Sequence, residues 1–154
     1  MLKEMRRKDR QLSEDEAMII LLKGEYGILS TIGTDYPYAV PVNYVAVNDS
    51  IYIHGTCELG QKDENIQKNS KVCFTVVGDT EVLHSKFSEK YESVIVIGIA
   101  ELSNGTDKIM ALEEFINKYS SEYQESGKKY IESAIDKVSV YKISINKITG
   151  KARR

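Results

Sequence analysis

The stretch YGILSTIGTDYPYAVPVNYVAVNDSIYIHG, residues 26–55, decides the fold class. It holds three runs rich in β-branched and aromatic residues, which predict strands over 26–32, 38–47 and 51–55. The links between the runs are short and carry turn-forming residues, Gly33-Thr34-Asp35 and Asn48-Asp49-Ser50. Strands that follow one another so closely pair as an antiparallel meander, because a parallel connection needs a long crossover. Pro37 and Pro41 predict that the second strand lies at an edge, starts there or carries a bulge.

Further strands are predicted in the second half of the chain, over 71–77, 93–100 and 138–145, which brings the count to six. The run at 93–100 is nearly continuous in β-branched residues and predicts a buried strand. In the last run the apolar alternation slips by one residue after Val140. The polar segment 78–91 predicts an irregular excursion between two strands.

Three or four helices are predicted between these strands. Ser13 and Glu16 match a capping box, so a helix is expected from there to about Lys23, with Gly24 as its stop. One-faced apolar patterns predict further helices over 58–68, 109–119 and 128–134. Many strands with short links, and a helix inserted after the third strand, are typical of a mainly β protein built as a closed or partly closed antiparallel barrel. We therefore expect one six-stranded barrel domain over residues 1–154, beginning with a basic arm at 1–11.

Composition limits the classes of function. The chain has 154 residues, of which 42% are hydrophobic and 29% charged, and this suits one globular domain. A net charge of −2 gives no general attraction for nucleic acid. Cys57 and Cys73 form no CxxC pair, and His54 and His84 complete no zinc spacing. The apolar stretch near the start is too short to span a bilayer and no secretory signal is recognisable, so we expect a cytoplasmic protein that binds neither membrane nor nucleic acid.

Three short motifs could carry chemistry. His54 ends a predicted strand and precedes Gly55, where a backbone can approach a ligand closely. Lys62 lies in the first turn of a predicted helix, and helix-start amides with a lysine could hold a phosphate. Ser30 and Thr31 place hydroxyls on the first strand. Each motif also has a plainer interpretation, namely a hydrogen-bonded rim histidine, a surface lysine and ordinary strand residues. The residues alone therefore predict a small antiparallel barrel that could bind an anionic ligand.

The order of these segments resembles that of a known family. No single motif is specific, but the ordered series spans nearly the whole chain. By this series the chain resembles the pyridoxamine 5′-phosphate oxidase-like flavin proteins, and within them it is most similar to the Nim group of nitroimidazole-resistance proteins. The series consists of Met5–Arg10, Tyr26–Thr31, Tyr36–Tyr44, Ile51–Gly55, Lys62 before Asn65-Ile66, Asn69–Phe74, Ser93–Gly98 and Ile148–Lys151.

The resemblance implies a split β-barrel, a homodimer, and FMN bound in clefts between the two protomers. It places His54 beside the flavin and Lys62 on the FMN phosphate, and it puts Gln61 where relatives often have a second basic residue. Segment 79–91 matches no motif of the family clearly, and we expect it to shape a substrate pocket. The remaining expected cofactor-binding residues are Ser30 and Thr31 along the flavin, Pro41, Val42 and Asn43 near its ring, Gly55 leaving room beside His54, and Ser93 near the phosphate.

The function that the resemblance implies is an FMN-dependent oxidoreductase that reduces small molecules, with nitroaromatics such as nitroimidazoles as candidates. NAD(P)H or another electron donor would reduce the flavin. His54 would donate a hydrogen bond or a proton to the reduced substrate, since histidine titrates near neutral pH. The alternative is a non-catalytic flavin- or haem-binding carrier or redox sensor on the same barrel, with His54 as a haem ligand. A deazaflavin in place of FMN also fits the sequence.

Overall fold

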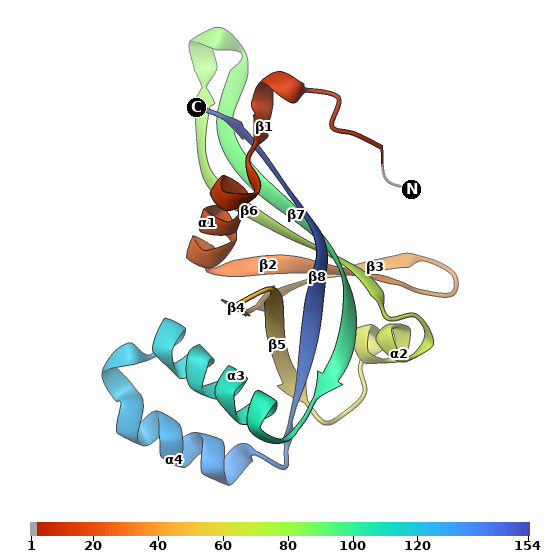
Figure 1. The fold of residues 1–154 in the computed structure, drawn as a ribbon, viewed down its shortest axis with the longest axis vertical. Helices are drawn as coiled ribbons and strands as arrows, with labels where there is room; N and C mark the ends of the chain where they lie inside the picture. Colours follow the sequence, from red (N-terminus) through yellow and green to blue (C-terminus); the bar gives the residue numbers. More distant parts are fainter. Residues whose placement is uncertain (1–2) are drawn as a thin grey trace.

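The computed structural model describes residues 3–154 and folds them into a strongly curved antiparallel sheet with helices packed on it (Figure 1). The strands are β1 (Gln11–Leu12), β2 (Tyr26–Ile32), β3 (Pro37–Asn43), β4 (Val45–Val47), β5 (Ser50–Thr56), β6 (Lys71–Leu83), β7 (Ser88–Ser103) and β8 (Val138–Arg153). The helices are α1 (Glu14–Lys23), α2 (Gln61–Lys68), α3 (Gly105–Tyr119) and α4 (Gln124–Ala134), with short 3-10 turns η1 (Lys8–Arg10), η2 (His84–Lys86) and η3 (Ser121–Tyr123).

The order of the strands explains how the sheet closes. It runs β3-β2-β6-β7-β8-β5-β4, with β1 added to β8, and every pairing is antiparallel. β3 and β4 lie at the two ends of this order, yet a single residue, Tyr44, joins them in the chain. The two edges of the sheet therefore meet at Tyr44, and the sheet curls into a split barrel. The predicted barrel class is confirmed, with eight strands in place of the six expected.

Tyr44 is also the point at which the predicted strand 38–47 breaks in two. Its backbone N–H donates to the hydroxyl of Tyr119 (3.1 Å), and its carbonyl accepts from Lys118 Nζ at 2.9 Å. Its own hydroxyl donates to the carbonyl of Leu21 in α1, and its side chain is fully buried. Side chains of α3 thus satisfy the backbone of Tyr44 as a neighbouring strand would. They lie far from Tyr44 along the chain, so the local sequence around Tyr44 does not predict the break.

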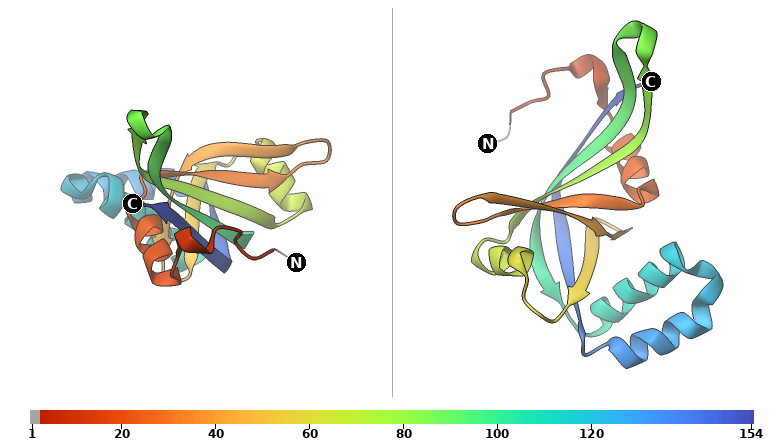
Figure 2. Two further views of the ribbon diagram at one scale, coloured as in Figure 1. Left: turned by 90° about the horizontal axis from the view of Figure 1, so that it is seen from above. Right: turned by 180° about the vertical axis from the view of Figure 1, so that it is seen from behind.

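Two hydrophobic cores lie on opposite faces of the sheet. The first fills the barrel, where Ala17, Ile20 and Leu21 of α1 pack against inward-facing strand residues. The second lies under α3 and α4, which form a helical hairpin at one end of the molecule (Figure 2). β8 is covered from both sides here, because Val140 belongs to the α3 core and Tyr141 to the barrel core. The apparent slip in the alternation of this strand therefore reflects burial on both faces.

The segment 78–91 forms most of a long hairpin, and the irregular excursion predicted there is wrong. β6 and β7 continue past the barrel after a bulge between Val77 and Thr80, and they stay paired as far as Leu83 and Ser88. At the tip, Phe87 is 98% exposed and adopts a positive φ of 48°. A two-stranded ribbon that projects from the barrel has no buried face, so the alternation that predicts a strand is missing from its sequence.

Other element boundaries differ from the predictions by smaller amounts. β8 continues to Arg153, well past the predicted end at 145, because a bulge opposite Ile97 and Gly98 lets it stay paired with β7. α4 begins at Gln124 instead of 128, and the capping box of α1 is present. The end of the basic arm joins the sheet as β1, while residues 1–2 lie outside the described part of the chain. No helix within residues 3–154 is both long and apolar enough to cross a membrane.

Candidate functional site

Helix α2 packs against β2 and β3 and brings polar groups together at one end of the barrel (Figure 1). It begins at Gln61, where the sequence predicted a start at 58, because Gly60 acts as its N-cap and the Asp63 carboxylate accepts from the Gly60 N–H at 2.9 Å. The first amides of a helix have no acceptor inside it, so this end of α2 favours negative charge. Asp63 supplies one such charge from within the chain.

Lys62 lies beside this buried carboxylate. Its Nζ is 3.0 Å from Asp63 Oδ2, and the two side chains are 19% and 2% exposed. Burial by itself would raise the pKa of Asp63, but the hydrogen bonds from Lys62 and Gly60 and the charge of Lys62 outweigh it and hold that pKa below its usual value. Lys62 is therefore a partly buried cation and not a solvated surface lysine. An ammonium has three N–H donors, so Lys62 keeps donors for an external anion while it binds Asp63.

Gly55 of β5 makes room for this lysine. A Cβ at position 55 would lie 3.2 Å from Lys62 Nζ, a distance too short for an ordinary contact. The space beside Gly55 is thus taken by the ammonium, where the sequence had led us to expect room for a planar ligand. The absence of a side chain at Gly55 lets Lys62 approach the end of β5 that carries His54.

His54 lies on the outward face of β5. Tyr52 belongs to the core under α3 while Ile51 and Ile53 belong to the barrel core, as the alternation of the strand predicts. The imidazole of His54 packs edge-on against Phe115 of α3, with 4.5 Å between ring centres and 84° between ring planes.

The surroundings of His54 set its charge. One face of the side chain stays exposed, yet the protein packed around the ring lowers the pKa of His54 by disfavouring the imidazolium, and the charge of Lys62 acts in the same direction. The ring is therefore uncharged at neutral pH. A neutral imidazole both donates and accepts a hydrogen bond, but it forms no ion pair with an anionic substrate.

A chain of hydrogen bonds joins α2 to β2. Asn65 Nδ2 donates to Thr31 Oγ1 and Gln61 Nε2 donates to Asn65 Oδ1, each at 2.9 Å, while Thr31 Oγ1 donates to the carbonyl of Tyr38 at 3.3 Å. Thr31 and Asn65 are each only 2% exposed. The hydroxyl of Thr31 thus already donates and accepts within the protein, so its first role is to position the helix.

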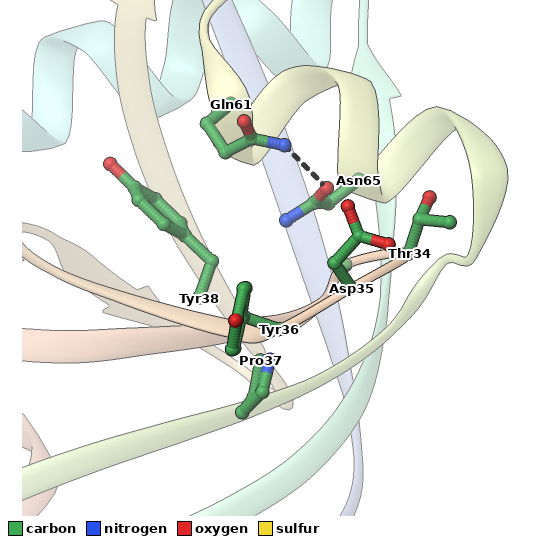
Figure 3. A pocket seen from close by; sticks show the side chains of 8 residues that line it. Thr34, Asp35, Tyr36, Pro37, Tyr38, Gln61 and Asn65 are labelled. Carbon is green, nitrogen blue, oxygen red and sulfur yellow. Dashed lines mark hydrogen bonds between the residues drawn. The ribbon is translucent and has the colours of Figure 1, made fainter.

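A cavity of about 360 Å³ opens beside this hydrogen-bonded chain. Figure 3 shows Gln61 and Asn65 on α2 along one side of the cavity and Tyr36, Pro37 and Tyr38 along the other. The cavity has the size of a small-molecule site, and its walls combine aromatic rings with amide groups. Such walls suit a flat, partly polar ring.

The other residues predicted for the site lie on the strands and away from α2. Ser30, Pro41 and Ser93 face outward from β2, β3 and β7, because their neighbours along each strand pack into the barrel core. Asn43 is paired with Tyr26 and is exposed, whereas Val42 packs against the barrel core.

Ser93 lies far from Lys62 within one chain. Ser93 and Ser103 are ten positions apart along β7, and Ser103 shares a cross-strand row with Val140 and His54. The structure therefore brings together four of the predicted residues, and Ser93 belongs to the other end of the sheet. The four are Thr31, His54, Gly55 and Lys62.

Three residues of this region were not assigned from the sequence. Asp63, three positions after Gly60, had a readable signal, because an acidic residue at the third helical position often closes a helix start. Asn65 had none, since its burial depends on Thr31 from a distant strand. Phe115 appeared only as one of several apolar residues on a helix face.

These features define a class of protein: a split antiparallel β-barrel with a partly buried cation at the start of a short helix and a histidine on the strand beside it. Residues 13–152 match the family described as pyridoxamine 5′-phosphate oxidase. The chain belongs to this family.

Solved structures share the fold. A putative 5-nitroimidazole antibiotic resistance protein from Bacteroides thetaiotaomicron is 25% identical with a TM-score of 0.77, over 92% of this chain and 86% of that one. A flavocytochrome from Azotobacter vinelandii is 18% identical with a TM-score of 0.77, over 98% and 72%. A FAD-binding protein from Mesorhizobium loti is 20% identical with a TM-score of 0.66, over 94% and 97%. The last two show the fold alone, and a search of the curated proteins finds no match.

Proposed function

We propose that this protein is an FMN-dependent oxidoreductase that acts as a homodimer and reduces small uncharged molecules, nitroaromatics such as nitroimidazoles among them. The observation that carries the proposal is the partly buried cation Lys62 at the start of α2, which lies against Gly55, the residue next to His54 on β5. The comparisons support it, since the neighbours include a FAD-binding protein, a flavocytochrome and a putative 5-nitroimidazole resistance protein.

The residues under α2 suit the two ends of FMN. The phosphate is a dianion that needs cations and N–H donors, which Lys62 and the first turn of α2 supply. The ring system is flat and carries amide-like edges, which the cavity between Tyr36 and Gln61 suits. When bound, the flavin would supply the hydride and electron transfer, which no side chain provides.

The chain's own residues would bind and orient the reactants. Lys62 would hold the phosphate together with the first amides of α2, without a second cation at the neighbouring position, which is the uncharged Gln61. His54 would hydrogen-bond the substrate atom on which negative charge develops during reduction. Because its imidazole is neutral, His54 favours uncharged acceptors over anionic ones.

The identity of the bound chromophore tests the cofactor. After saturation with FMN, the purified protein is expected to be yellow and to release FMN when it is denatured, as identified by mass spectrometry. Turnover of NAD(P)H with a nitroimidazole then separates an enzyme from a carrier. Absence of FMN binding, or release of FAD, a deazaflavin or haem from freshly purified protein, contradicts the proposal.

The outer face of the sheet supports the dimer. Cross-strand pairing lines up rows of mostly small and apolar residues on this face, one of them ending in Lys147, and Ile95 in the other row is 45% exposed. An uncovered apolar surface of this kind marks an interaction site. A two-fold axis through the face would set the Ser93 end of one protomer against the α2 end of its partner. Two such rows are Ile28, Thr75, Ile95, Thr149 and Ser30, Cys73, Ile97, Lys147.

Ile95→Glu is expected to convert the dimer into a monomer. The variant would bury an unpaired carboxylate at the interface, which costs several kcal/mol, while each single chain keeps its fold because Ile95 faces away from the barrel core. Light scattering gives the mass, and circular dichroism checks the fold. Tyr130→Glu, at a 69% exposed position on α4, is the control and should remain dimeric. A dimeric Ile95→Glu protein would place the interface elsewhere.

A further inference from the structure

The imidazole of His54 packs against helix α3, which contributes no residue to the groups at α2 that we propose bind FMN. Phe115 of α3 is 7% exposed, and its ring meets the imidazole edge-on at 4.5 Å. α3 and α4 form a helical hairpin inserted between β7 and β8, outside the barrel (Figure 2). Within residues 3–154, the aromatic contact of His54 thus comes from this insertion.

The insertion is held to the barrel by a second aromatic residue of α3, Tyr119. Tyr119 stacks on Phe115, with 5.9 Å between ring centres and 18° between planes. Its hydroxyl accepts from the backbone N–H of the buried Tyr44, and Lys118 Nζ donates to the Tyr44 carbonyl. A continuous series of contacts therefore runs from Tyr44 through Tyr119 and Phe115 to His54. Because packed side chains of this kind sit in single rotamers, the series restricts where the imidazole points.

Few charged groups face His54. From α2, Lys62 disfavours the imidazolium, and its partner Asp63 is itself bound to Lys62 and Gly60. On α3, the carboxylate of Asp107 is held by Tyr52 and Ser103 and lies 3.8 Å from Nζ of Lys142 on β8, and Lys118 is held by Tyr44. No carboxylate pairs with His54 among the described residues, so nothing compensates the cost of charging a ring packed against Phe115.

We propose that Phe115 is the positioning residue for His54. From α3 it orients the imidazole and excludes water from one side of it, so that His54 meets the substrate as an uncharged hydrogen-bonding group. The inference rests on the proposed function for the role of His54, but the contact and its effect on protonation exist without flavin. On this proposal the α3–α4 insertion contributes to substrate selectivity. It keeps His54 neutral, and a neutral His54 favours uncharged electron acceptors.

Nuclear magnetic resonance of the imidazole protons tests this in the protein without flavin. The chain has two histidines, and the second, His84 on the exposed tip of the β6–β7 hairpin, is an internal reference. Phe115→Ala is expected to raise the pKa of His54. In the flavin-loaded protein, the acid limb of the pH–rate profile should move to higher pH. Turnover per bound flavin should fall by roughly ten- to a hundredfold, since the imidazole is no longer held in place.

Three variants separate positioning from general loss of packing. Phe115→Leu keeps an apolar group over the ring and should restore most of the low pKa of His54. Leu112→Ala removes apolar volume from the same core of the same helix and should lower stability without moving that pKa. Lys62→Gln should raise the pKa of His54, because it removes a nearby positive charge while Phe115 stays in place. An unchanged His54 titration in Phe115→Ala overturns the inference. A shifted titration in a protein that binds no flavin upholds the contact and rejects the proposed function.

Discussion

Replacing His54 by alanine is expected to reduce turnover per bound flavin by about 10²–10⁴-fold while FMN affinity changes little. A fall in turnover of this size is typical when a side chain that stabilises charge or transfers a proton at the reacting atom is removed. The structure supports a small effect on cofactor binding, because the phosphate-binding groups are Lys62 and the start of α2 and His54 carries no charge at neutral pH. The pH dependence has a defined sign: activity that needs the neutral imidazole is present above the lowered pKa of His54 and is lost as the pH falls through it.

The measurement has three parts on one preparation: turnover with NAD(P)H and an uncharged nitroaromatic acceptor, the FMN dissociation constant, and the melting temperature. His84→Ala is the histidine control for the last two, since this residue is exposed on the hairpin tip and its loss should change neither the FMN dissociation constant nor the melting temperature. His54 packs on Phe115, so some loss of thermal stability is expected in His54→Ala. If stability and FMN are lost together and turnover per bound flavin is unchanged, the histidine is structural.

Lys62→Gln is expected to weaken FMN binding by about ten- to a hundredfold. A charge-assisted hydrogen bond to phosphate contributes roughly 1.5–3 kcal/mol, which corresponds to that change in affinity. Glutamine is chosen over alanine because Asp63 is 2% exposed and relies on Lys62 for a hydrogen bond, which an amide can still donate. Truncation of Lys62 to alanine would leave the buried Asp63 carboxylate without this partner, so a binding defect could not be told apart from a folding defect.

Riboflavin separates the two explanations of a weaker affinity, because it has the same ring and no phosphate. Loss of the Lys62 charge should leave riboflavin binding unchanged while it lowers FMN binding. Lys68→Gln, at the exposed last position of the same helix, should alter neither. Equal weakening of both ligands would show that Lys62 supports the shape of the pocket and does not hold the phosphate.

The strands with one buried face could be predicted closely from the sequence. The strand predicted over 26–32 coincides with β2, and the capping box at Ser13 fixed the start of α1. In both cases the signal is local. The alternation of apolar residues in β2 indicates which side of the strand is buried, and the capping hydrogen bonds of α1 form between Ser13 and Glu16. The order of segments along the chain was sufficient to indicate the family, which the match over residues 13–152 confirms.

Long-range contacts decided what local patterns missed. The predicted strand 38–47 is broken at Tyr44 because Lys118 and Tyr119, some 75 residues away along the chain, bind its backbone. The hairpin formed around 78–91 was not predicted, because a ribbon with no buried face carries no alternation.

The candidate site shows the same division. The sequence by itself determined the barrel class and the residue types at the site, a histidine at a strand end and a lysine at a helix start. Only the tertiary structure decided that Gly55 makes room for Lys62, that Asp63 and Lys62 pair, and that Phe115 covers His54. The physical reason is that the charge of an ionisable group depends on its neighbours in space: β5 and α2 must fold onto one another, and Phe115 comes from α3, which is distant along the chain.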